Sequence, residues 1–198
     1  PLEYSEQMEH VAPFAKRLHI DVADGEFAPR LISLSQVWWP VGVIADFHIM
    51  HQHPWREWET IISHRPQLVI VHAEADLEDF VVRIAELHPL GIALGLASFQ
   101  PTPVTAIDPN LIALVDHALI FSGDLGHFGG DADLNLLDKI LELKAINPRL
   151  EFGWDGGANK KNVAKLAKGG VNVITSGGFI HKAKDPLHAY IELAHRCM

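Results

Sequence analysis

The chain has 198 residues, of which 48% are apolar, and a formal net charge of −9 with histidines counted as neutral. This charge argues against nucleic-acid binding, which needs a basic face. No apolar run is long enough to cross a bilayer and no signal peptide stands at the front, so we expect no membrane partner. The single cysteine, Cys197, allows no intramolecular disulfide and fits a reducing cytosol, which predicts a cytoplasmic protein.

Short runs rich in Val and Ile alternate with segments of helical spacing along the chain. Leu2–Tyr4 is expected to be the stub of a first strand. The other predicted strands are Leu18–Val22, Val43–Phe47, Leu68–Val71, Gly91–Leu96, Ala118–Phe121, Leu150–Trp154 and Val171–Thr175. The predicted helices are Ser5–Phe14, Pro54–Ser63, Leu77–Leu87, Pro109–Leu114, Leu134–Lys144, Lys160–Lys168 and Asp185–His195.

No linker or repeat interrupts this alternation, so residues 1–198 are predicted to form one domain. Alternating strands and helices allow either a closed barrel or an open doubly wound sheet. An open nucleotide-binding sheet usually carries a G-x-G-x-x-G turn, and none follows any predicted strand. The glycines instead cluster after the last three strands, where many barrels hold a phosphate. The sequence therefore favours an α/β (β/α)8 TIM barrel whose first strand is short or truncated.

Polar side chains gather at the ends of several predicted strands, which is where a barrel keeps its catalytic residues. His19 and Asp21 lie two residues apart and therefore share one face of a strand. His48 follows the next strand, and Asp155 follows the strand Leu150–Trp154. Two imidazoles and two carboxylates suit one divalent metal ion, and Zn²⁺, Fe²⁺, Mn²⁺ and Co²⁺ all fit. The alternative is that each histidine is simply hydrogen-bonded in the core.

Six short segments, in this order and with near-family spacing, resemble the motifs of ribulose-phosphate 3-epimerases. They are His19–Gly25, Phe47–Met50, His72–Glu74, Phe128–Gly130, Asp155–Gly157 and Ser176–Gly178. The resemblance implies a barrel of the ribulose-phosphate-binding type and a metal held by His19, Asp21, His48 and Asp155. It also implies that Asp21 and Asp155 are the two acid/base carboxylates. The expected reaction is epimerisation of a ketose phosphate at C3, from D-ribulose 5-phosphate to D-xylulose 5-phosphate or a close analogue.

The chemistry of such a reaction explains the residue types. Epimerisation beside a ketone removes a proton from one face of a carbon and returns one to the other face. This takes two carboxyl groups on opposite sides, one ionised and one protonated. The enediolate intermediate carries negative charge, which a divalent ion stabilises as a Lewis acid.

Glycines predict where the phosphate of the substrate binds. Their backbone N–H groups are suited to a dianion, although tight turns alone also require glycine. The glycines concerned are Gly129, Gly130, Gly156, Gly157, Gly177 and Gly178. The loop before Gly130 has one residue more than the family's Gly-Phe-Gly-Gly. Three aspartates, Asp124, Asp131 and Asp133, flank this loop and would repel a dianion unless they point away.

Other residues leave alternatives open. Met50 faces the substrate, as in the family, or fills space in the core. Glu74 orients a ligand histidine or caps the following helix. Trp38 and Trp39 cover the barrel mouth or form an oligomer contact, and an exposed aromatic pair favours a homo-oligomer. Ala23 and Phe121 stand where the family usually has methionines.

Two further functions compete with the epimerase. Related sugar-phosphate aldolases and decarboxylases carry an Asp-x-Lys-x-x-Asp motif, whereas the segment Asp46–His51 has histidine in place of the lysine and no second aspartate. This difference favours the epimerase. A barrel that binds a sugar phosphate without turnover is the non-enzymatic alternative, because fold does not determine function.

Overall fold

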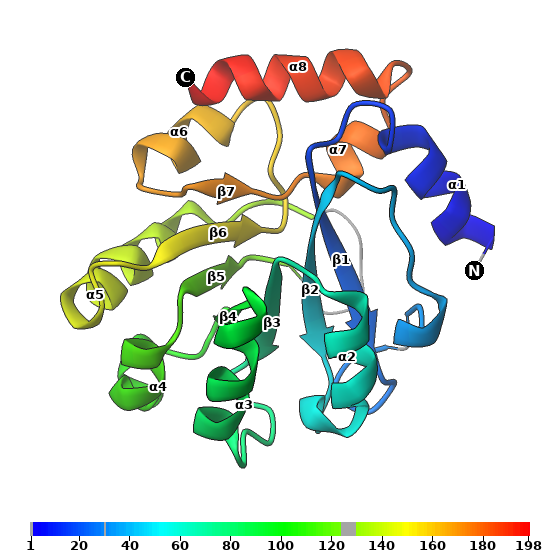
Figure 1. The fold of residues 1–198 in the computed structure, drawn as a ribbon. Helices are drawn as coiled ribbons and strands as arrows, with labels where there is room; N and C mark the ends of the chain where they lie inside the picture. Colours follow the sequence, from blue (N-terminus) through cyan, green and yellow to red (C-terminus); the bar gives the residue numbers. More distant parts are fainter. Residues whose placement is uncertain (1, 30, 124–129) are drawn as a thin grey trace. The chain divides into compact units, whose positions relative to one another are not determined.

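The computed structural model describes residues 2–29, 31–123 and 130–198. The chain divides into two compact units, Pro1–Leu96 and Ala97–Met198. In each unit parallel strands alternate with helices, as the sequence predicts (Figure 1). The described residues contain seven strands, so closure into an eight-stranded barrel stays a prediction. No helix in this part of the chain is long and apolar enough to cross a membrane.

The first unit holds three paired strands, β1 to β3, and the start of a fourth. Its elements are α1 (Leu2–Val11), β1 (Arg17–Ala23), η1 (Leu34–Gln36), β2 (Ile44–Met50), η2 (Pro54–Glu57), α2 (Trp58–His64), β3 (Leu68–His72), α3 (Phe80–Leu87), η3 (His88–Leu90) and β4 (Ala93–Ser98), where η marks a 3-10 helix. β1 pairs with β2 and β2 with β3, both in parallel. β4 crosses the boundary between the units.

The predicted strand stub Leu2–Tyr4 is wrong, because these residues begin helix α1. Tyr4, Met8 and Val11 recur at spacings of four and three, so they share one helical face, and Met8 and Val11 are buried. No Gly or Pro interrupts residues 2–11, and the three residues Leu2–Tyr4 are too short a segment to favour a strand by their alternation.

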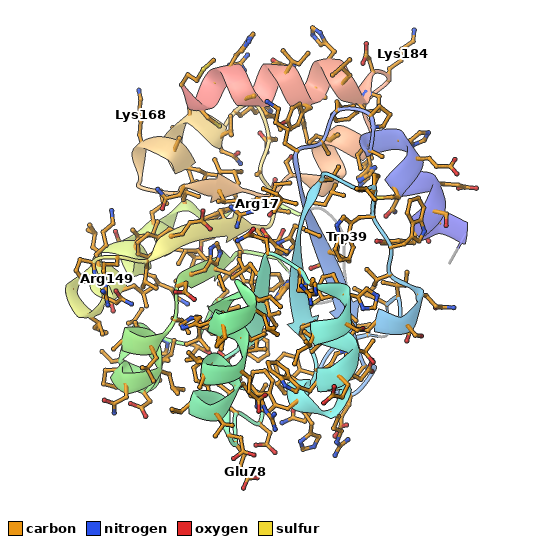
Figure 2. All side chains as sticks on the ribbon, in the orientation of Figure 1. Arg17, Trp39, Glu78, Arg149, Lys168 and Lys184 are labelled. Carbon is orange, nitrogen blue, oxygen red and sulfur yellow. The ribbon has the colours of Figure 1, made fainter. Side chains whose placement is uncertain are left out.

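One face of the strands in the first unit is apolar and packs against helices. Ile20, Phe47 and Val69 come from three neighbouring strands and are almost fully buried. The ring of Phe47 lies 5.7 Å from the ring of His64 at the end of α2, and 5.6 Å from that of Trp39, which Figure 2 labels. Because side chains alternate along a strand, the residues between these apolar positions point to the opposite face.

The second unit repeats the alternation around strands β5 to β7. Its elements are η4 (Val104–Ala106), α4 (Pro109–Leu114), β5 (His117–Phe121), η5 (Leu134–Leu137), α5 (Asp138–Ile146), β6 (Glu151–Asp155), α6 (Val163–Lys168), β7 (Val173–Ile174), α7 (Gly177–His181) and α8 (Pro186–Cys197). β5 pairs with β6 and β6 with β7, again in parallel. The last helix, α8, packs against α6 and α7 (Figure 1).

The predicted helices exist, although several begin or end elsewhere. α8 begins where the sequence predicts, because Asp185 accepts a hydrogen bond from the backbone nitrogen of His188 and Pro186 occupies the first turn. The segment predicted as Leu134–Lys144 starts as η5 and becomes α5 at Asp138. Helix α7, which the sequence analysis did not predict, begins at Gly177.

Candidate metal centre

The register between β1 and β2 places three of the predicted ligands side by side. Asp21 stands opposite His48 in the parallel ladder, and His19 precedes Asp21 by two residues on the same face of β1. His48 Nδ1 lies 2.9 Å from Asp21 Oδ1, and His19 Nε2 lies 3.4 Å from the same oxygen. The ligand atoms of these three residues all lie within 4.8 Å of one another. The carboxyl ends of two neighbouring strands therefore form a cluster, called the β1–β2 cluster below.

The protonation of the β1–β2 cluster suits a cation. Burial would raise the pKa of Asp21, but hydrogen bonds with His19 and His48, and the charge of each ring when protonated, hold it well below its usual range. Burial lowers the pKa of His48 and outweighs the opposite effect of the Asp21 carboxylate. The carboxylate is thus ionised and the His48 ring neutral near pH 7. These are the forms in which carboxylate and imidazole bind metals.

A third histidine, on the next strand, contacts the β1–β2 cluster. His72 is the last residue of β3 and is fully buried. Its Nε2 lies 2.9 Å from His48 Nε2, and its Nδ1 lies 3.5 Å from Glu74 Oε2. The motif His72–Glu74 in the sequence includes both residues, but it does not predict the contact between His72 and His48. The signal that the sequence offers for this contact is the position of His48 and His72 near the carboxyl ends of neighbouring strands.

Asp24 shapes the loop that follows β1. Its carboxylate accepts hydrogen bonds from the backbone nitrogens of Glu26 and Phe27 and, across to the end of β2, from that of Gln52. Burial raises the pKa of Asp24, but these three backbone donors outweigh it and lower the pKa below its usual value. Asp24 therefore ties together the loops that follow β1 and β2.

Other polar and aromatic residues of the first unit have structural partners. Asp46, on the face of β2 that carries His48, accepts a hydrogen bond of 2.6 Å from Nε of Arg17, which Figure 2 labels at the start of β1. Met50 ends β2 and is buried. Trp39 is half-buried and its ring contacts those of Phe47 and His64, whereas Trp38 is 42% exposed and its carbonyl accepts a hydrogen bond from the hydroxyl of Tyr4.

The fourth predicted ligand, Asp155, belongs to the second unit. It is the last residue of β6 and stands opposite Phe121, the last residue of β5. Its carbonyl accepts a hydrogen bond of 2.7 Å from the backbone nitrogen of Ser122. Asp155 thus occupies the carboxyl end of its strand, as predicted, and its side chain is partly exposed.

Gly156 and Gly157 follow Asp155, and the local backbone conformation and packing require glycine at both positions. Both have a positive φ, of 113° and 66°. A Cβ on Gly156 would come within 2.5 Å of the backbone at Ser122 and Gly123, and one on Gly157 would meet the backbone nitrogen of Ala132. These contacts favour the alternative in which the two glycines make a tight turn.

The remaining predicted phosphate glycines lie in open surroundings or outside the description. A Cβ on Gly130 or on Gly177 would meet no atom of the described residues within 4 Å. Gly177 and Gly178 form the first turn of α7. Gly129 and Asp124 lie outside the described residues. Asp133 is engaged locally, because its carboxylate accepts hydrogen bonds from the backbone and side chain of Asn135 and from Gln100.

Solved structures with similar folds define the class of protein. A 3-hexulose-6-phosphate synthase has a TM-score of 0.69 and 18% identity, covering 96% of this chain and 91% of that one. The phosphoribosyl anthranilate isomerase of Thermus thermophilus has a TM-score of 0.66 and 15% identity, covering 98% and 94%. At such identities the likeness shows the fold alone. The chain therefore has a TIM-barrel-like α/β fold, with a cluster suited to a divalent metal at its strand ends.

Sequence comparison identifies the family. The model of the ribulose-phosphate 3 epimerase family matches residues 1–181, so the chain belongs to this family and is an epimerase. The ribulose-phosphate 3-epimerase of Helicobacter pylori (strain ATCC 700392 / 26695) is 31% identical, covering 85% of this chain and 80% of that protein. The ribulose-phosphate 3-epimerase of Mycobacterium leprae (strain TN) is also 31% identical, covering 94% and 86%.

Proposed function

We propose that this chain epimerises a ketose phosphate at C3 with the help of one divalent metal ion, converting D-ribulose 5-phosphate to D-xylulose 5-phosphate or a close analogue. The observation that carries the proposal is the carboxylate of Asp21 within hydrogen-bonding distance of His48 and next to His19. Membership of the family supports the reaction, and the relatives named above carry the substrate in their names.

The β1–β2 cluster has the donor chemistry that a first-row divalent cation requires. Two imidazole nitrogens and one carboxylate oxygen lie within 4.8 Å of one another, close enough for small adjustments to bring them around a single ion. Zn²⁺, Fe²⁺, Mn²⁺ and Co²⁺ all accept such ligands. We propose Asp155 as the fourth ligand, because it ends β6 and supplies the second negative charge.

The two aspartates are proposed to move the proton at C3. One of them, ionised, removes the proton from one face of the carbon, and the other, protonated, returns a proton to the opposite face. When bound, the metal supplies Lewis-acid stabilisation of the negative charge that develops on the substrate oxygens. The pKa of Asp21 is held well below its usual range, so its carboxylate is ionised at neutral pH and is suited to accept a proton.

The phosphate is proposed to bind at the glycines that leave space for it. Gly177 and Gly178 begin α7, and an added Cβ on Gly177 would enter open space rather than other described residues. Gly129 and Gly130 precede η5 in the sequence and are proposed to contribute as well. Gly156 and Gly157 follow β6, where they form the tight turn. Because Asp133 is hydrogen-bonded to Asn135 and Gln100, its charge is partly satisfied by local donors.

The proposal is tested by comparing two variants of β6, each of which lacks one carboxylate at one end of the strand. Asp155→Asn should abolish epimerisation of D-ribulose 5-phosphate and weaken metal binding while the protein stays folded. The matched control is Glu151→Gln, at the amino end of the same strand, whose carboxylate contacts His117. Turnover is followed by NMR in D₂O, since a proton removed at C3 is replaced by deuterium. Near-wild-type turnover in Asp155→Asn would rule out the proposed role of this residue.

A further inference from the structure

His72 lies beyond the proposed metal ligands but contacts one of them directly. Its Nε2 is 2.9 Å from Nε2 of His48, and both rings are fully buried. The ring planes are inclined by only 23° and the centroids are 5.0 Å apart. Because the centroids are much farther apart than the two nitrogens, the rings meet edge to edge. This is the arrangement of an N–H···N hydrogen bond.

Such a bond needs one nitrogen with a hydrogen and one without. A neutral imidazole carries one hydrogen, so the role of one ring nitrogen sets the role of the other. Nδ1 of His48 points at Asp21 Oδ1, within the β1–β2 cluster. If Nδ1 is to bind a cation through its lone pair, the hydrogen of His48 must sit on Nε2. Nε2 of His72 must then accept it, and the hydrogen of His72 must sit on its own Nδ1.

Glu74 favours this distribution of hydrogens. Its Oε2 lies 3.5 Å from Nδ1 of His72, so a negative charge faces the ring nitrogen that should carry the hydrogen. The chain turns sharply after β3, where the backbone nitrogen of Ala75 donates to the carbonyl of His72, and this turn brings Glu74 next to the ring. The opposite tautomer would set a lone pair against a carboxylate, which is repulsive.

We infer that His72, supported by Glu74, is a positioning residue that holds His48 in the tautomer with its hydrogen on Nε2 and its Nδ1 lone pair directed at the metal. The inference rests on the proposed metal site. It adds to that site two residues that touch neither the metal nor the substrate. Partners of this kind orient a ligand histidine and raise its basicity, and their loss typically weakens metal binding about 10- to 100-fold.

The hydrogen positions are measured first, in the unmodified full-length protein loaded with Zn²⁺, which is diamagnetic. Nitrogen-15 NMR of the histidine rings should show hydrogen on Nε2 of His48 and on Nδ1 of His72. A scalar coupling between the two Nε2 atoms should report the hydrogen bond that joins them. Hydrogen on Nε2 of His72 instead, donated toward His48, would overturn the inference without any variant being made.

Metal affinity is then measured with Co²⁺ by chelator competition and visible absorption. His72→Leu removes the acceptor and should weaken Co²⁺ binding about 10- to 100-fold, with a changed absorption spectrum. His72→Gln keeps an oxygen that accepts from His48 and should restore most of the affinity. The matched control is His117→Leu. His117 is also buried and paired with a glutamate, Glu151 at 2.8 Å, but it begins β5 and so lies at the amino end of its strand.

The outcomes separate this inference from the proposed function. If the unmodified protein binds neither Zn²⁺ nor Co²⁺ through His48, the metal site itself is wrong and the inference is wrong with it. If the unmodified protein binds metal but His72→Leu binds it equally well, the metal site stands and the positioning role is wrong. Should His72→Leu fail to fold, the tautomers in the unmodified protein and the affinity of His72→Gln decide.

Discussion

Replacing Gly157 by alanine tests whether the glycines after β6 serve the backbone or a ligand. Gly157 has a φ of 66°, and a Cβ there would meet the backbone nitrogen of Ala132 and come within 2.5 Å of the backbone carbon of Asp131. Both partners are backbone atoms, so no side-chain rotation relieves the contact. The variant should therefore lose stability whether or not a phosphate binds nearby.

The expected loss follows from two contributions. A non-glycine residue in the left-handed region costs about 1 kcal/mol. Forcing a methyl group into a packed site costs about 1 to 3 kcal/mol more. The free energy of unfolding should therefore fall by about 2 to 4 kcal/mol. In a chain of this length each kcal/mol lowers the Tm by about 2 to 4 °C, which predicts a fall of roughly 5 to 15 °C.

Two other glycines separate the contributions. Gly91 has a φ of 74°, but an added Cβ would meet no described atom within 4 Å, so Gly91→Ala should cost only about 1 kcal/mol. Gly177 has neither a positive φ nor a close neighbour among the described residues, so Gly177→Ala should change stability by less than about 0.5 kcal/mol. The assay is urea unfolding followed by circular dichroism. If Gly157→Ala costs no more than Gly91→Ala, the reasoning from the backbone contact is refuted.

Three further predictions concern ligands and pH. Gly177→Val should raise KM for a phosphorylated ketose far more than for its unphosphorylated analogue, and a parent enzyme without preference for the phosphorylated sugar would contradict the phosphate site. Removing metal with a chelator should abolish turnover and lower the Tm, since a ligand at about 100 times its Kd stabilises by roughly 2.7 kcal/mol, and adding Co²⁺ or Zn²⁺ back should reverse both. Because the folded-state pKa of Asp24 is lowered, its contribution to stability should be complete above the ordinary carboxyl pKa of about 3.9 and should disappear as the pH falls through the folded value. The difference in unfolding free energy between the parent and Asp24→Ala should shrink accordingly in acid, and a difference that grows would contradict this sign.

The sequence predicted the β1–β2 cluster because its geometry depends on regular structure. The spacing of His19 and Asp21 placed both on one strand face, and parallel strands bring their carboxyl ends to one edge. The side-by-side placement of Asp21 and His48 additionally needed the register, which no single-strand pattern contains. The contact between His48 and His72 was beyond prediction, because it depends on the direction of two rings across a strand pair.

Other features depend on packing that short segments do not encode. Leu2–Tyr4 has residues compatible with a strand, yet it continues into a helix whose buried face includes Met8 and Val11. Glycines were predicted as phosphate donors as one group, but the structure divides them. Gly156 and Gly157 approach backbone from distant positions, whereas Gly177 faces open space among the described residues. The residue is glycine in both cases, so only the neighbouring atoms in the structure distinguish a glycine that forms a tight turn from one that leaves space for a ligand.

Two aspartates on neighbouring strands show how the structure distinguishes a binding carboxylate from a structural one. Asp46 is almost fully buried, and the guanidinium of Arg17 at 2.6 Å supplies a permanent positive charge, so its ion pair is complete within the fold. The partners that the structure gives Asp21 are imidazoles, and burial lowers the pKa of His48, so this ring supplies no permanent charge. Asp21 is nevertheless held ionised. An ionised carboxylate beside a neutral imidazole is the arrangement that a bound cation completes, because the cation adds the charge that the His48 ring does not carry.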